Sequence, residues 1–239
     1  MINRIIYFFS MFIIFVFLII FSQKRNSKNK ILKVSIDFKY ENGKFLDSQM
    51  VNKLLIQRRD TAYLLKEEML DLKVVEDLLI SNPMVASADI FRTPQGVLNV
   101  KLQERKPIAR IINDNEEFYI DNFGYRFPIS KKYSARVPIF YGQADKILED
   151  LVNFIKLIKT DSFAKVEIID LRNLKNNYVL SLRSFPFKII WGENSKNKHK
   201  IKKLKFLYSY LGNKDFLKIE KVNLSFDKQI VLDYGQNGK

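Results

Sequence analysis

An uncharged apolar run near the amino terminus constrains this chain more than any other feature of its sequence. From Ile5 to Phe21 no residue is charged, and only Tyr7 and Ser10 carry polar groups. About 17 residues at roughly 1.5 Å each span about 25 Å, the short end of a membrane crossing. Because lipid offers no hydrogen bonds to a bare backbone, the run is expected to be helical. The sequence therefore predicts a single transmembrane helix over residues 5–22, followed by a folded remainder.

The residues that flank this run leave its processing and orientation open. A cleaved signal peptide is the alternative, although the run is longer than the usual apolar region of such peptides and no small-residue cleavage pattern follows it. Arg4 precedes the run, whereas the polar segment 23–30 that follows it is basic throughout, with Lys24, Arg25, Lys28 and Lys30. A count of positive charges alone would keep the folded part in the cytoplasm.

The residue types that are missing exclude several chemistries. Cysteine is absent, so a disulfide framework, a thiolate metal site and a cysteine nucleophile are all excluded. His199 is the only histidine, which excludes a zinc site with several histidine ligands. We find no nucleophile elbow, P-loop or dinucleotide fingerprint. We therefore expect a protein that is not an enzyme and has no catalytic, cofactor-binding or metal-binding residues.

The formal net charge of +15 suggests that the chain could bind a negatively charged partner. Basic chains can bind nucleic acid or anionic lipid. The densest basic stretch contains Lys198, Lys200, Lys202, Lys203 and Lys205. Acidic residues are mixed in throughout the chain, and no cluster of arginine and aromatic residues stands out. We therefore interpret the lysines as a solvated surface and expect no nucleic-acid partner, with a nucleic-acid binder as the rival reading.

Residues 31–105 have the pattern of a small α+β module. Apolar residues alternate over 31–38, which predicts a half-buried strand. Two helices are expected next, the first capped by Asp47 or Ser48 and ending near residues 58–60, the second running from Asp71 to the Asn82-Pro83 break. Strands over 85–92 and 97–103 follow, joined by a Gly96 turn. The order β-α-α-β-β allows two helices to cover one face of a three-stranded sheet.

Residues 106–235 read as a second, β-rich part. Strands are expected over 108–112, 118–120, 164–171, 178–183 and 187–191, and helices over 145–159 and 195–211. Gly212 stands where the cap of the second helix belongs. The last two strands, 217–226 and 229–234, are joined by Asp227-Lys228. We expect the final strand to lie at a sheet edge and residues 236–239 to form a short tail, so the fold class is α+β.

Two segments carry a family resemblance. The first runs from Leu79 to Ala109, and its landmarks are Leu79, Pro83, Val85, Ala88, Arg92, Pro94, Leu98, Val100, Leu102, Glu104, Arg105, Pro107 and Ala109. The second is the stretch from Tyr119 to Phe127, with a hydrophobic-Asp-x-x-Gly-x-x-Phe pattern. In this order they resemble the FtsQ/DivIB family of bacterial cell-division proteins. Most of these landmarks also have a structural explanation, such as a helix stop at Pro83 or a turn at Gly124.

The resemblance implies a domain plan and a location. It implies a cytoplasmic N-terminus over residues 1–4, the transmembrane helix over 5–22 in the lipid bilayer, and a basic linker over 23–30. A polypeptide-transport-associated (POTRA) domain over 31–105 and an FtsQ-type β domain over 106–235 would then lie outside the cytoplasmic membrane, at the division septum. This single-pass orientation in the inner (plasma) membrane opposes the charge count, and we adopt it because flanking charge biases orientation without fixing it.

The resemblance also implies a role. It implies a non-catalytic scaffold that binds FtsB-like and FtsL-like division proteins and, through the POTRA domain, other division proteins. Phe226 and Tyr234 fall where the family has partner-contacting aromatic residues, with capping of the core as their alternative role. Ile230 and Leu232 join the predicted partner site because strand addition to the last strand would involve them. A POTRA-bearing envelope chaperone or protein-translocation component remains the alternative function.

Overall fold

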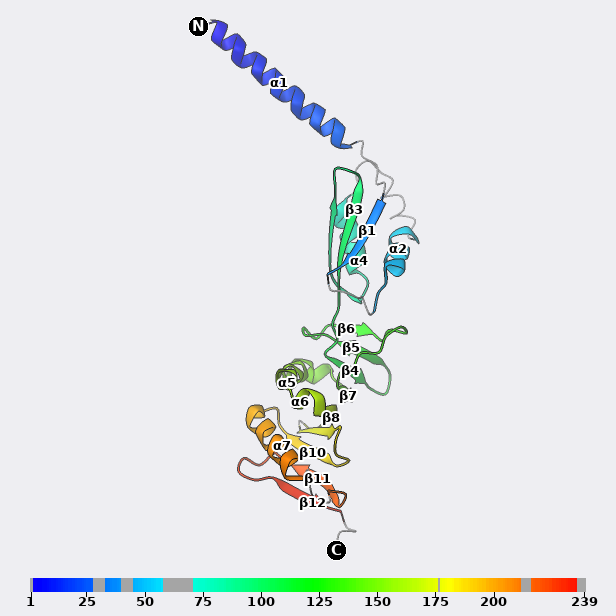
Figure 1. Ribbon diagram of the computed structural model, residues 1–239, viewed down its shortest axis with the longest axis vertical. Helices are drawn as coiled ribbons and strands as arrows, with labels where there is room; N and C mark the ends of the chain where they lie inside the picture. The colour runs from blue at the N-terminus through cyan, green and yellow to red at the C-terminus, as the bar shows by residue number, and fades with distance from the viewer. Residues whose placement is uncertain are drawn as a thin grey trace. The chain divides into compact units, whose positions relative to one another are not determined.

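The computed structural model describes residues 2–27, 33–39, 45–57, 71–175, 177–211 and 216–235 (Figure 1). Packing divides the chain into two units, Met1–Arg105 and Lys106–Lys239. Within the described residues, one unit contains a three-stranded sheet and the other a nine-stranded sheet. Each unit has its own cluster of buried apolar residues. Helices and mixed sheets together confirm the predicted α+β class.

The amino-terminal segment forms helix α1, Ile2–Ser27, which continues into the segment predicted to be a linker. No helix in the described part of the chain is both long enough and apolar enough to cross a membrane. This finding overturns the prediction of a transmembrane helix over residues 5–22.

After α1, the described residues of the first unit form a strand, two helices and two more strands, in that order. These elements are β1 (Lys33–Phe38), α2 (Ser48–Gln57), α4 (Leu72–Ile80), β2 (Val85–Arg92) and β3 (Val97–Glu104). The sheet order is β1-β3-β2, with β1 parallel and β2 antiparallel to the central β3. The expected break at Asn42-Gly43 and the expected helix end at residues 58–60 lie outside the described residues.

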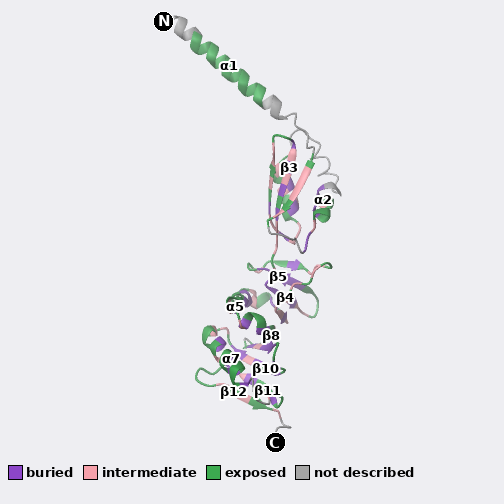
Figure 2. Ribbon diagram, in the orientation of Figure 1, coloured by how far each residue is buried: buried purple, intermediate pink, exposed green. Residues whose placement is uncertain are grey.

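Both helices of this unit pack on the same face of its sheet. Alternate residues of β3 are buried and meet apolar residues of both helices in one core, whose members include Leu98, Val100 and Leu102 of β3, Val51 and Leu55 of α2, and Val75 and Leu79 of α4. Figure 2 colours the described residues by their burial. The start of α4 is capped by Asp71, whose carboxylate accepts from the Lys73 N–H at 2.9 Å. Asp47 caps α2 in the same way through the Met50 N–H at 2.6 Å.

Two landmarks of the family resemblance hold loops of the first unit in place. The Glu104 carboxylate accepts from the backbone N–H groups of Phe45, at 3.1 Å, and Leu46, at 2.6 Å. The Arg105 guanidinium donates to the carbonyl oxygens of Pro83, at 3.1 Å, and Val85, at 3.0 Å. Both residues therefore connect the end of β3 to distant backbone, a structural role for this part of the motif.

The second unit is built on one long mixed sheet. Its strands are β4 (Ala109–Ile112), β5 (Glu117–Ile120), β6 (Arg126–Pro128), β7 (Ile139–Tyr141), β8 (Ile168–Leu174), β9 (Asn177–Leu182), β10 (Lys188–Gly192), β11 (Ile219–Asn223) and β12 (Val231–Tyr234). Its helices are η1 (Asp145–Ile147), α5 (Leu148–Thr160), α6 (Ala164–Glu167) and α7 (Asn197–Leu211). The sheet order is β12-β11-β10-β9-β8-β7-β4-β5-β6. Along the chain, helix α5 connects the parallel strands β7 and β8, and α7 connects the parallel strands β10 and β11.

The core of the second unit lies between this sheet and helices α5 and α7, which lie on the same side of it (Figure 1). Aromatic rings occupy its centre. The Phe154 ring on α5 stacks on Tyr178 at 4.7 Å between centroids and meets the edge of Trp191 at 5.6 Å. The buried Trp191 satisfies its indole N–H with the Asn197 side-chain oxygen at 2.8 Å, at the start of α7.

Two predicted strands differ from the structure for local reasons. The strand expected over 164–171 starts at Ile168, because the Asp161 carboxylate accepts from the N–H groups of Phe163 and Ala164, both at 3.0 Å, and nucleates the short helix α6. The strand expected over 217–226 ends at Asn223, whose side chain instead accepts from the Ser225 N–H at 2.9 Å. The expected helix cap Gly212 lies outside the described residues.

Candidate partner interface at the last strand

Strand β12 stands at one end of the nine-stranded sheet order. It pairs antiparallel with β11, in a register that sets Leu232 opposite Val222 and Val231 opposite Asn223. No other strand among the described residues pairs with its outer side. An edge strand of this kind carries backbone N–H and C=O groups that a strand from another chain can pair with.

The opposite edge of the same sheet is less suited to pairing. Strand β6 is three residues long and ends in Pro128, which has no N–H to donate. Its first residue, Arg126, forms ion pairs with Asp145 and, at 3.8 Å, with Glu116. Short length, proline and charge are the usual means by which an edge strand is protected from pairing. Of the two edges of this sheet, β12 is therefore the more open one.

The structure brings the four predicted partner-binding residues together on and beside β12. Phe226 lies in the turn before the strand and is 47% exposed, and Tyr234 ends the strand and is 53% exposed. Neither belongs to the buried core, and their role in partner binding stays a prediction. Ile230 and Leu232 are half-buried and pack against the core, which fixes the register of β12. Val231, on the other face of the strand, is exposed as well.

Two side chains of helix α7 and one from the residue before it hold the turn between β11 and β12. The Lys203 ammonium donates to the carbonyl oxygens of Phe226 and, at 3.3 Å, of Gln229. Lys196 forms an ion pair with the Asp227 carboxylate, and its hydrogen bond lowers the pKa of that carboxyl. The His199 ring nitrogen Nε2 lies 3.0 Å from the Asp227 carbonyl oxygen. The turn that carries Phe226 is therefore attached to a helix that is itself part of the core.

The end of β10 packs closely against the same region. The Leu224 N–H donates to the Ile190 carbonyl oxygen at 2.8 Å, which brings the chain after β11 alongside β10. Gly192 has a φ of +80°, and a Cβ placed on it would lie 2.8 Å from the Ser225 Cβ. A glycine is required at this position for both its backbone angle and its lack of a side chain.

The lysines of α7 do not form one continuous basic face. Lys200 is buried, its ammonium donates to the Glu193 carbonyl oxygen at 2.8 Å, and burial lowers its pKa. Lys203 is engaged with the turn before β12, as described above. Sequence analysis missed the burial of Lys200, although its spacing from Leu204, Leu207 and Leu211 places it on the apolar face of the helix. This arrangement does not support a nucleic-acid surface made of all five lysines.

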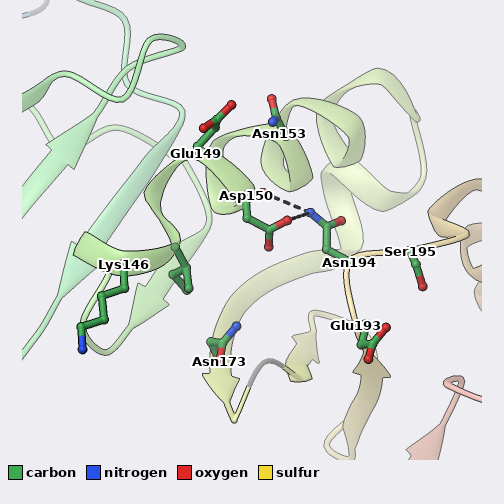
Figure 3. Close-up of a pocket in the computed structure, with 9 residues that line it drawn as sticks. Lys146, Glu149, Asp150, Asn153, Asn173, Glu193, Asn194 and Ser195 are labelled. Carbon is green, nitrogen blue, oxygen red and sulfur yellow. Dashed lines mark hydrogen bonds between the residues drawn. The ribbon is translucent and has the colours of Figure 1, made fainter.

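A polar pocket of about 640 Å³ lies between the start of α5 and the segment after β10 (Figure 3). Asp150 and Asn194 point toward one another in it, and the Asn194 amide donates to the Asp150 carboxylate at 2.6 Å (Figure 3). The Tyr178 hydroxyl donates to the same carboxylate at 2.8 Å, and burial raises the pKa of Tyr178. Among the described residues, no group of three or more His, Cys, Asp or Glu side chains is placed to hold a metal ion. Asp150 thus has a structural role.

The fold and the open edge define a class of protein, an α+β chain with an unpaired edge strand among its described residues. Comparison with protein families then gives a specific match. A family model described as "FtsQ/DivIB, C-terminal related" matches residues 106–232, more than half of the chain. The chain belongs to the FtsQ/DivIB family, which confirms the resemblance and gives the protein a role in cell division, with division proteins as partners and a location related to the septum. A comparison with curated proteins gave no match.

Proposed function

We propose that this protein is a non-catalytic scaffold of the division machinery that binds FtsB-like and FtsL-like proteins by strand addition to β12. The observation that carries the proposal is the open edge at β12, within the unit that the family model matches. In strand addition, backbone hydrogen bonds supply affinity and alternate side chains supply specificity. The chaperone or translocation alternative would use the same kind of edge, and the family match favours division.

Phe226 and Tyr234 are the proposed anchors of this interface. Both are aromatic and about half exposed, and they stand at the two ends of the β12 region. Aromatic side chains held on a rigid support often supply most of the binding energy of an interface. Ile230 and Leu232 complete the proposed site, because their packing against the core sets which backbone groups β12 offers to an added strand.

Titration of the protein with a purified segment of an FtsB-like partner tests this proposal. We expect Phe226→Ala and Tyr234→Ala each to weaken binding by about 2 kcal/mol, or roughly 30-fold, without changing the unfolding transition. Phe123→Ala is the matched control, because Phe123 is 92% exposed on the turn between β5 and β6, away from β12 in the sheet order. Unchanged affinity in both interface variants would remove these residues from the site.

The proposal also specifies on which side of the cytoplasmic membrane the protein acts. We infer from the family resemblance that both units act outside the cytoplasmic membrane. A reporter enzyme that is active only outside the cytoplasm, fused to the carboxyl terminus, should then be active in dividing cells. A silent reporter, with the fusion still recruited to midcell, would place the protein on the cytoplasmic side.

A further inference from the structure

A second hollow of the second unit lies between α5 and α7 and differs in chemistry from the edge at β12. Its volume is about 690 Å³. The residues that line it come from these two helices and the turn after α5, and they are Asn153, Lys156, Leu157, Thr160, Asp161, Lys198, Ile201, Lys202 and Lys205. We call this hollow the lysine groove. Its floor includes the half-buried Leu157 and the buried Ile201, so charged side chains surround an apolar base.

The lysine groove has a strong excess of positive charge. Its lining contains four ammonium groups and one carboxylate, a net charge of 4 − 1 = +3. The carboxylate belongs to Asp161 and is fully engaged, because it accepts from Lys205 at 2.6 Å and from two backbone N–H groups of the turn into α6. The hydrogen bond from Lys205 lowers the pKa of Asp161. Asp161 therefore compensates Lys205 and leaves the other three lysines uncompensated.

Those three lysines, Lys156 on α5 and Lys198 and Lys202 on α7, differ from other lysines nearby. Lys196 and Lys203 are used to hold the turn before β12. Lys156, Lys198 and Lys202 are exposed, and they form no ion pair or hydrogen bond with any of the described residues. Like charges gathered around one hollow repel one another, and an anion bound between them would turn that repulsion into attraction. Apolar walls strengthen such a field compared with open water.

We propose that the lysine groove binds an anion carrying two or more phosphate groups. The groove has no arginine, whose planar fork binds carboxylates and phosphates alike, so its cations are all lysines. Lysine instead acts as a point charge and is a common phosphate ligand. Lysines on two helices can reach tetrahedral phosphate oxygens from different directions, and Asn153 and Thr160 add hydrogen-bonding groups at the rim. This site goes beyond the proposed partner interface and does not depend on it.

Calorimetric titration of the full chain with tripolyphosphate at low salt tests the site. We expect the wild-type protein to bind and the Lys198→Gln/Lys202→Gln variant to bind about tenfold more weakly, because exposed charge pairs contribute modestly each. Lys131→Gln/Lys218→Gln is the matched control, since it removes the same charge from exposed positions outside the groove and should change affinity less than twofold. All variants alter exposed side chains, so their unfolding transitions should match that of the wild type.

Three results would overturn the proposal. The first is no binding of tripolyphosphate by the wild-type protein. The second is equal weakening in both double variants, which would mean a general charge effect rather than a site. The third is groove-dependent binding of a hexaglutamate peptide as tight as that of tripolyphosphate, which would assign the groove to acidic peptide segments.

Two vesicle measurements identify the source of the phosphate. Binding to vesicles that contain cardiolipin, whose headgroup carries two phosphates, but not to phosphatidylcholine vesicles, that is lost in the Lys198→Gln/Lys202→Gln variant would support the proposal with a lipid headgroup as the ligand. Tripolyphosphate binding without vesicle binding would support it with a soluble phosphate ligand.

Discussion

Gly192 is the residue whose backbone most directly supports the candidate interface. It has a φ of +80°, and an added Cβ would lie 2.8 Å from the Cβ of Ser225, one residue before Phe226. Gly192→Ala must therefore both strain the backbone and push the Phe226 turn away. We expect a loss of about 2–3 kcal/mol in the free energy of unfolding, measured by denaturant titration.

Gly124→Ala provides the control for backbone strain. Gly124 has nearly the same angle, a φ of +77°, but its nearest neighbours to an added Cβ lie at 3.5 Å, an ordinary contact distance. We expect this variant to lose about 1 kcal/mol, the cost of the left-handed conformation alone. Equal losses in the two variants would show that the approach of Ser225 to Gly192 has no energetic consequence.

The role of a single residue can be predicted from the sequence when it depends on residues close to it in the chain. The turn at Gly124 was predicted, and Gly124 has the positive φ expected of it. The structure adds that the Asp121 carboxylate accepts from the N–H groups of Phe123, at 2.8 Å, and Tyr125, at 2.9 Å. The lysine groove was not predicted, because Lys156 and Lys202 become neighbours only when α5 and α7 pack on the same side of the sheet. Sequence separation alone gives no sign of that meeting.

Among the elements, β12 depends on α7 for its position. Its turn is attached to the helix by Lys203, which donates to two carbonyl oxygens of the turn. Lys203→Met keeps the apolar stem and removes the charge. We expect amide hydrogen exchange over residues 226–230 to become about tenfold faster, because hydrogen bonds from a charged donor each contribute about 1.5 kcal/mol or more.

The neighbouring Lys202→Met is the control for this element. Lys202 lies on the same helix, is exposed and makes no hydrogen bond to the turn. Its loss should leave exchange in residues 226–230 unchanged. If both variants exchange alike, α7 does not hold the turn through Lys203, and the rigidity of Phe226 must come from elsewhere.

Helices and strands whose apolar residues repeat at a regular spacing were predicted from the sequence. Elements that depend on one or two contacts were not. Alternation correctly indicated β1, β3 and β12, and helical spacing correctly indicated α5 and α7. The strands β6 and β7 are three residues each, too short to show a period. Helix α6 follows from one carboxylate, Asp161, that accepts two backbone N–H groups. A local pattern does not establish the order of strands in a sheet. The edge position of β12 was nevertheless expected for the last strand, and the sheet order places it there.

On the scale of the whole molecule, the two units have separate cores. Each apolar cluster contains residues of one unit only. The chain has a single tryptophan, Trp191, and it is buried in the second unit beside Phe154. Its fluorescence therefore reports the unfolding of the second unit alone, even in the full chain.

From this arrangement we expect residues 106–239 to fold and to bind the partner segment without the first unit. Their core includes the side chains that α5, α7 and the long sheet bury, so removing residues 1–105 takes away none of its members. Tryptophan fluorescence should give the same denaturant midpoint for residues 106–239 as for the full chain, and titration should give the same affinity for an FtsB-like segment. A lower midpoint or the loss of a cooperative transition would mean that the first unit stabilises the second. An unchanged midpoint with weaker binding would instead mean that the first unit supplies part of the partner interface.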